Sequence, residues 1–115
     1  SAWAATSGAN PAQEVLVPPS QAEDVNLVLS GNSHNYERTG PLTNGAVASG
    51  GITDVVSGAG GNGFNAFTIS QPSWSAFREA SYYEFVKVTV SPTKLTVDAV
   101  RADSNAVVDT TTISK

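Results

Sequence analysis

Apolar and polar positions alternate most regularly in the last third of the chain. The alternation runs through residues 84–90, stops at Ser-Pro-Thr-Lys (91–94), returns in residues 95–101, and follows once more in residues 107–113 after a turn at 102–105. Such alternation places every second side chain on one face of a strand, and short turns join antiparallel neighbours. The pattern predicts a C-terminal antiparallel meander with one buried face.

Two shorter apolar segments lie upstream of this region. Residues 25–30 form a nearly continuous apolar run ending at Gly31, the pattern of a strand buried on both faces. Residues 51–57 form a second β-type run and lead into residues 58–63, where glycine dominates and a loop is expected. The polar stretch from Asn32 to about Ser49 is also expected to be a loop. No long helix is predicted, so the fold class is mainly β.

The first 21 residues have a different character. Gly8, Pro11, Pro18 and Pro19 lie there among small polar residues. Because proline fixes φ and restricts the residue before it, this segment is expected to be a loop or a poorly ordered lead-in. At most one helical turn is expected, over residues 12–17. Residues 22–115 then form the remaining, folded part of the chain.

Composition narrows the function classes. With 10 acidic and 6 basic residues the formal net charge is -4, so no basic face for a nucleic acid is expected. No apolar run approaches the roughly 18 residues that cross a bilayer, so no membrane partner is expected either. The absence of cysteine excludes disulfides and thiolate metal sites. A composition rich in small residues and poor in lysine favours a secreted or extracytoplasmic protein.

The one histidine of the chain, His34, follows directly after the first predicted strand, within Ser-Gly-Asn-Ser-His-Asn-Tyr-Glu-Arg (30–38). A loop at the end of a buried strand is where open sheets place ligand groups. On general grounds, however, a lone histidine is more often a surface or a satisfied residue than a metal ligand. The residues alone leave both interpretations open.

Three segments carry a family resemblance. Residues 25–38, the glycine-rich strand exit at 55–63, and Gln-Pro-Ser-Trp-Ser-Ala-Phe-Arg-Glu-Ala-Ser (71–81) occur in the order found in calcineurin-like metallophosphoesterases of the purple acid phosphatase type. The chain resembles the C-terminal portion of these enzymes over about residues 22–115. The resemblance implies the C-terminal part of an α/β/β/α sandwich, with a strand, a metal-site loop, a glycine-rich turn and the meander.

The resemblance also implies a pair of metal ions, Fe, Zn or Mn, that hydrolyse a phosphoric monoester. In the family, the two histidines of a Gly-His-X-His motif each bind a different metal. Here the second is His34, whereas the first position is Asn32, a weaker ligand than imidazole. The other family ligands precede this region, and residues 1–24 contain no counterpart.

The sequence therefore leaves two functions open. The chain is either the C-terminal part of a phosphomonoesterase that is inactive alone, or a degenerate non-catalytic binding or structural module on the same scaffold. The expected partners are a phosphate ester, if the enzyme is complete, and a missing N-terminal half or a second copy of the chain, which would cover an exposed sheet.

Several other residues have a structural and a functional interpretation, and the structural one is favoured in each case. Tyr36 is expected to pack, and Glu37 is expected to pair locally with Arg38. Arg78 and Glu79 are expected to form an ion pair, and the glycine-rich loop to be a tight turn rather than a phosphate cradle. The aromatic residues are expected in the core; they are Trp74, Phe77, Tyr82 and Tyr83. A catalytic triad of Ser33 or Ser57 with His34 and Asp54 lacks a nucleophile-elbow pattern.

Overall fold

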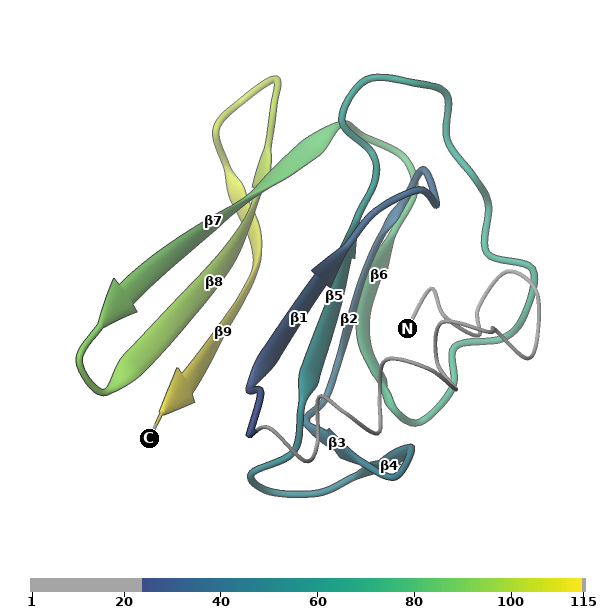
Figure 1. Ribbon diagram of the computed structural model, residues 1–115. Coiled ribbons are helices and arrows are strands. Elements are labelled where there is room, and N and C mark those ends of the chain that lie inside the picture. Colours follow the sequence, from purple (N-terminus) through teal and green to yellow (C-terminus); the bar gives the residue numbers. More distant parts are fainter. Residues whose placement is uncertain (1–23, 115) are drawn as a thin grey trace.

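The computed structural model describes residues 24–114, and all regular structure within that range is β (Figure 1). The strands form a four-stranded sheet in the order β1-β5-β2-β6, a small β3-β4 ribbon, and a three-stranded sheet in the order β7-β8-β9. The predicted fold class is confirmed. The described residues contain no helix long and apolar enough to cross a membrane. The possible helical turn at 12–17 lies outside the described range.

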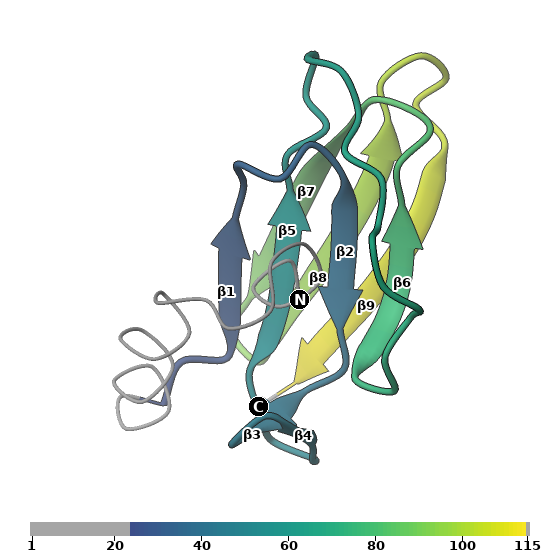
Figure 2. The same cartoon turned by 90° about the vertical axis from the view of Figure 1, so that its right-hand side faces the viewer.

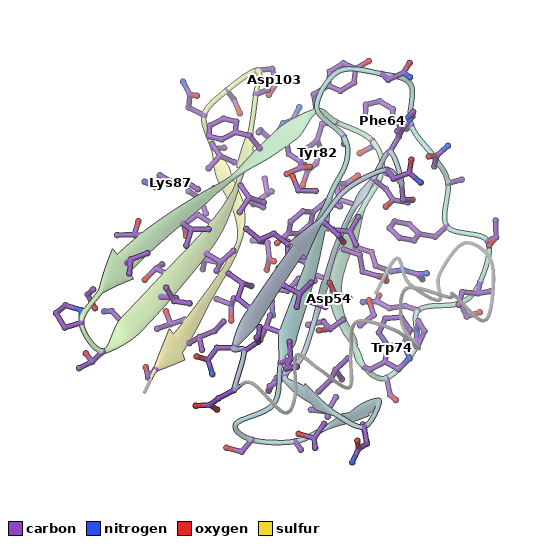
Figure 3. All side chains as sticks on the ribbon, in the orientation of Figure 1. Asp54, Phe64, Trp74, Tyr82, Lys87 and Asp103 are labelled. Carbon is purple, nitrogen blue, oxygen red and sulfur yellow. The ribbon has the colours of Figure 1, made fainter. Side chains whose placement is uncertain are left out.

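The C-terminal meander consists of β7 (Glu84–Ser91), β8 (Lys94–Arg101) and β9 (Val107–Ser114), and it confirms the prediction from alternation. Adjacent strands pair in antiparallel register. Its inner face carries small and branched apolar side chains, and its outer face carries polar side chains such as Lys87, which points away from the other sheet (Figure 3). The alternation of apolar and polar residues predicted these strands correctly because each strand has one buried face.

The four-stranded sheet consists of β1 (Leu27–Ser30), β2 (Tyr36–Thr39), β5 (Thr53–Ser57) and β6 (Ser75–Glu79). Strands β1 and β5 are parallel, whereas β2 runs antiparallel to both of its neighbours, β5 and β6. Figure 2 shows this sheet in front of the meander. Because β1 and β5 are parallel, the loops that follow them leave at the same end of the sheet.

The core lies between the two sheets. Its buried members are Tyr36, Val55, Val97 and Ala99, with two residues from each sheet. Partly buried apolar side chains surround them; these are Leu27, Phe77, Val86, Val88 and Val108. Tyr36 therefore packs as expected, and its ring meets Phe77 edge-on with centroids 6.0 Å apart. Burying these side chains against each other joins the sheets into a sandwich.

The opposite face of the four-stranded sheet carries several buried polar side chains beside the buried Val56. Glu37, Thr39, Asp54 and Ser75 are all less than 10% exposed. Glu37 accepts a hydrogen bond from Ser75 Oγ at 2.8 Å, and the same carboxylate forms an ion pair with Arg78, whose Nε lies 3.0 Å away. Buried polar groups of this kind persist because they are hydrogen-bonded to one another.

The structure corrects the sequence analysis in the first half of the chain. The first predicted strand exists, but it is not buried on both faces, because Leu29 is 53% exposed. The predicted loop at 32–49 is wrong in part, since it contains β2 and the ribbon of β3 (Leu42–Thr43) and β4 (Ala46–Val47). Strand β6 was not predicted either. Strands β2 and β6 carry polar residues whose partners lie far away in the sequence, such as Glu37 and Arg78.

Candidate functional site

Two loops meet at the end of the parallel strands, residues 31–35 after β1 and residues 58–63 after β5. The Gly58 N–H donates to the Asn35 carbonyl at 3.0 Å. A Cβ added to Gly58 would lie only 1.9 Å from the Ser33 carbonyl oxygen. The two backbones are therefore in direct contact, at a distance that only glycine permits.

His34 is held by Gly63 of the second loop and by Asn65, which follows that loop. Its Nδ1 lies 2.9 Å from the Gly63 carbonyl oxygen, and its backbone N–H donates to Asn65 Oδ1 at 2.7 Å. The Asn65 N–H donates in turn to the His34 carbonyl at 2.9 Å. Because a carbonyl only accepts hydrogen bonds, this contact assigns the proton to Nδ1 and leaves the Nε2 lone pair for a metal ion.

Asn32 lies two residues before His34 on the same loop and is exposed. Its φ of 74° is in the left-handed region, which asparagine and histidine enter more readily than most residues. The side chain borders an open hollow at this end of the molecule. The residues that line this hollow are Asn32, Ser33, Phe64, Asn65, Ala66 and Thr68. Metal binding by Asn32 and His34 stays a prediction.

This loop provides one residue that suits a metal ion, His34, but not the full set of ligands that a metal centre requires. Imidazole nitrogen suits Zn and Fe. The Gly63 carbonyl orients the ring, as the hydrogen-bond partner of the other ring nitrogen does in most metal-binding histidines. Within residues 24–114, no three His, Cys, Asp or Glu side chains come together as a metal-ligand group. The described residues thus provide one oriented imidazole.

Glu84, at the start of β7, connects the meander to the glycine-rich loop and was not singled out from the sequence. It is 3% exposed, and Ser57 Oγ lies 3.0 Å from each of its carboxylate oxygens. Its backbone N–H donates to the Ala59 carbonyl at 3.1 Å. Burial raises the pKa of the Glu84 carboxyl, and hydrogen bonds from Ser57 and the Ala59 backbone offset part of that rise.

An aromatic contact joins the same two segments at the other end of the loop. The rings of Phe64 and Tyr83 have centroids 4.9 Å apart, and both side chains are about two-fifths exposed. Figure 3 shows Phe64 and the neighbouring Tyr82 at this end of the molecule. Tyr82 lies under the Arg101 guanidinium, 4.5 Å from its ring centroid. Of the aromatic residues expected in the core, only Phe77 packs against the core cluster.

The ion pairs differ from those predicted. Glu37 pairs with Arg78, whereas Arg38 forms two hydrogen bonds with Asp109, at 2.7 and 2.9 Å. The local pair of Glu37 and Arg38 is wrong because adjacent residues in a strand point to opposite faces. The predicted pair of Arg78 with Glu79 is wrong for the same reason.

Asp109 also fastens β2 to β9. Tyr36 donates its hydroxyl to Asp109 Oδ2 at 2.8 Å, beside the two bonds from Arg38. Burial, and then the Asp109 carboxylate, raise the pKa of the Tyr36 phenol above its ordinary value. This cluster bridges the two sheets two residues away from His34.

The triad considered from the sequence is not assembled through Ser57. The Ser57 hydroxyl donates to Glu84, and the His34 Nδ1 faces the Gly63 carbonyl. Serine hydrolases require the serine hydroxyl to be bonded to the histidine and a carboxylate to the other ring nitrogen. The site therefore lacks the geometry of that mechanism.

Comparison with known protein families identifies the segment that contains the glycine-rich loop and most of the meander. The family model described as "Iron/zinc purple acid phosphatase-like protein C" matches residues 51–110, which include the glycine-rich loop and most of the meander. His34 lies outside the matched segment. The match covers more than half of the chain.

Individual relatives extend the similarity to the His34 loop. "Probable inactive purple acid phosphatase 1" of Arabidopsis thaliana is 33% identical over 106 residues, which are 83% of this chain and 17% of that protein. "Nucleotide pyrophosphatase/phosphodiesterase" of Hordeum vulgare is 31% identical over 102 residues, 79% of this chain and 27% of that protein. The chain thus spans about a quarter or less of their length.

A solved structure shows the same fold. The purple acid phosphatase PPD1 from yellow lupin (Lupinus luteus) seeds superposes with a TM-score of 0.79 at 27% identity, over 93% of this chain and 20% of that one. The matched family model, the relatives and the structure agree with the motif order. The chain belongs to the purple acid phosphatase family and corresponds to the C-terminal part of its members.

Proposed function

We propose that this chain is the C-terminal part of a metal-dependent phosphoric monoester hydrolase, and that it contributes His34 Nε2 to the metal centre. The hydrogen bond between His34 Nδ1 and the Gly63 carbonyl carries the proposal, because it fixes the ring and directs the free lone pair outward. Asn32 takes the position of the first family histidine and offers a weaker, neutral oxygen ligand.

When bound, a pair of Fe, Zn or Mn ions supplies the Lewis acid for the phosphate and the hydroxide for its hydrolysis. The residues of this chain orient and hold the imidazole, through Gly63 and Asn65, at the end of a rigid sheet. The other ligands are proposed to come from an N-terminal part of a longer parent protein, since the relatives are several times longer than this chain. The substrate class proposed is phosphate monoesters.

The test has two arms. The 115-residue chain should show no hydrolysis of p-nitrophenyl phosphate with added Zn, Fe or Mn, because one imidazole cannot hold a catalytic pair of ions. Titration with Zn²⁺, followed by NMR of the single histidine, should show weak binding at Nε2 that is lost in His34→Ala. Absence of any Zn²⁺ effect on His34, or turnover that His34→Ala does not remove, would contradict the proposal.

A second candidate is a non-catalytic binding or structural module on the same scaffold. It is favoured by Asn32, which stands where the family has a metal-binding histidine and is a weaker ligand than imidazole. The Arabidopsis relative is itself named as an inactive member of the family. Intact-mass measurement and sequencing of the natural protein separate the candidates, since a longer parent with the upstream aspartates and Gly-Asn-His motif favours the enzyme.

A further inference from the structure

We propose that Glu84 and Tyr83, the residues at the entrance to β7, position the His34 imidazole by holding both ends of the glycine-rich loop 58–63. Neither residue touches the histidine, so their role is positioning. The inference rests on the proposed function of His34 as a metal ligand. Its test nevertheless reads the state of the ring directly and needs no metal ion.

Glu84 holds the first end of the loop. Its carboxylate accepts from Ser57 Oγ through both oxygens at 3.0 Å, and its backbone N–H donates to the Ala59 carbonyl at 3.1 Å. Gly58 lies between Ser57 and Ala59, and its backbone contacts the 31–35 loop. Glu84 therefore fixes the point at which the two loops meet.

Tyr83 holds the second end. Its ring packs on Phe64, the residue that directly follows Gly63, with centroids 4.9 Å apart. The Tyr83 carbonyl accepts from the Ala102 N–H at 3.0 Å, so the meander anchors this residue in turn. The Gly63 carbonyl, which receives His34 Nδ1, thus lies one residue from a fixed ring.

The middle of the loop has no packing of its own. A Cβ added to Gly60, Gly61 or Gly63 would meet no atom within 4 Å. Glycine is also the residue with the most backbone freedom. The position of the Gly63 carbonyl therefore depends on the two ends of the loop, both of which the entrance to β7 holds, and on Asn65, which bonds the His34 backbone.

The chain has one histidine, so ¹⁵N long-range correlation spectra report His34 without ambiguity. The spectra are recorded on the full 115-residue chain at mildly alkaline pH, for the wild type and for Glu84→Ala, Glu84→Gln and Tyr83→Leu. Val97→Ala, in the buried core of the meander, controls for lost stability. Phe85→Leu controls for Tyr83→Leu, because Phe85 is a neighbouring exposed ring on β7, and alternation along the strand places it on the same outer face as Lys87.

The wild type, Val97→Ala and Phe85→Leu should show one dominant tautomer with the proton on Nδ1. Glu84→Ala and Tyr83→Leu should lose that dominance, and their Zn²⁺ affinity should fall roughly 10- to 100-fold. Glu84→Gln retains an acceptor oxygen for Ser57 and should restore most of the Nδ1–H form. If Glu84→Ala does not fold, Tyr83→Leu carries the same test, since its side chain is exposed.

An unchanged tautomer in Tyr83→Leu and in folded Glu84→Ala would overturn the positioning role, whatever the Zn²⁺ result. An equal loss of the Nδ1–H form in Val97→Ala would also overturn it, because the effect would then follow stability alone. A wild type with the expected tautomer but no Zn²⁺ response would refute the proposed function and leave the positioning role standing.

Discussion

The two sheets of the sandwich are built in opposite ways. The meander is continuous in sequence, and its strands of 8 residues pair with their neighbours along the chain. The four-stranded sheet uses strands of 4 or 5 residues, and the chain crosses between them, so that β1 pairs with β5 and β2 with β6. The strands of the meander are marked by the local sequence pattern, whereas the strands of the four-stranded sheet depend on partners that are distant in the sequence.

Charges follow the same division. In the meander, Arg101 pairs with Asp103 two residues away, and their side chains are 37% and 63% exposed. Between the sheets, Arg38 on β2 pairs with Asp109 on β9, 71 positions away, and both side chains are mostly buried. Breaking a buried pair leaves an uncompensated charge, whereas an exposed pair is replaced by water. Substitutions should therefore be far more costly in and around the four-stranded sheet.

The largest effect is expected for Gly58→Ala. The new methyl group would overlap the Ser33 carbonyl and force the two loops apart, lowering the free energy of unfolding by about 3 kcal/mol or more. Urea denaturation measures this change. Gly60→Ala is the matched control, because a Cβ there meets nothing within 4 Å. Equal stability of the two variants would show that the loops are not in contact.

The next effect is expected for Asp109→Ala. The substitution leaves Arg38 and the Tyr36 hydroxyl without their shared acceptor and should cost about 2–3 kcal/mol in urea denaturation. Asp98→Ala is the control on the same sheet, where the carboxylate accepts one exposed hydrogen bond from Thr110. It should cost under about 1 kcal/mol. Similar losses in both variants would contradict a special role for the inter-sheet cluster.

A smaller effect, dependent on pH, is expected for Glu84. Because burial raises the pKa of Glu84, the folded chain keeps a proton on it over a pH range in which the unfolded chain has lost it. The contribution of Glu84 is fully present below the usual glutamate pKa of about 4.3. It decreases as the pH rises through the raised pKa and is constant above it.

Urea denaturation of the wild type and Glu84→Gln across this pH range tests the sign. The stability of the wild type relative to the variant should be highest in acid and should fall toward neutral pH. The difference between them at neutral pH should stay within about 1 kcal/mol, because glutamine retains an acceptor for Ser57. Parallel pH profiles would show that Glu84 has an ordinary pKa in the fold.

The smallest effect is expected for Asp103→Ala. Its pair with Arg101 lies on an exposed turn, so water replaces it and no measurable change in the midpoint of thermal unfolding is expected. A loss as large as that of Asp109→Ala would remove the distinction between the two regions.

The same division explains how much of the fold the sequence revealed. Alternation in residues 84–113 predicted all of the meander, because its pattern depends on one buried face. Strand β2 was missed because Glu37 and Arg38 are polar, and only distant partners make their burial favourable. The β3-β4 ribbon carried a signal that was overlooked, since Asn44 and Gly45 form an Asn-Gly turn with positive φ at both positions.

For the candidate site, the motif identified the His34 loop and the glycine-rich loop but not what holds them. Glu84 and Tyr83 occupy ordinary positions at the start of an alternating strand, and Asn65 lies in an irregular segment. Their contacts with the loops arise only when the sheets stack, so no local pattern marks them. Residue spacing reveals the groups that carry chemistry more readily than those that orient them.

Glu84 carries a consequence for how activity is lost during evolution. The contact that shapes the histidine loop also joins the start of β7 to the end of β5, so natural selection for folding alone would preserve it. A lineage whose enzyme had stopped turning over substrate would then keep the outline of the site as a by-product of staying folded. In such lineages, conservation of the loops indicates that the fold is retained, and only conservation of the metal ligands indicates that catalysis is retained.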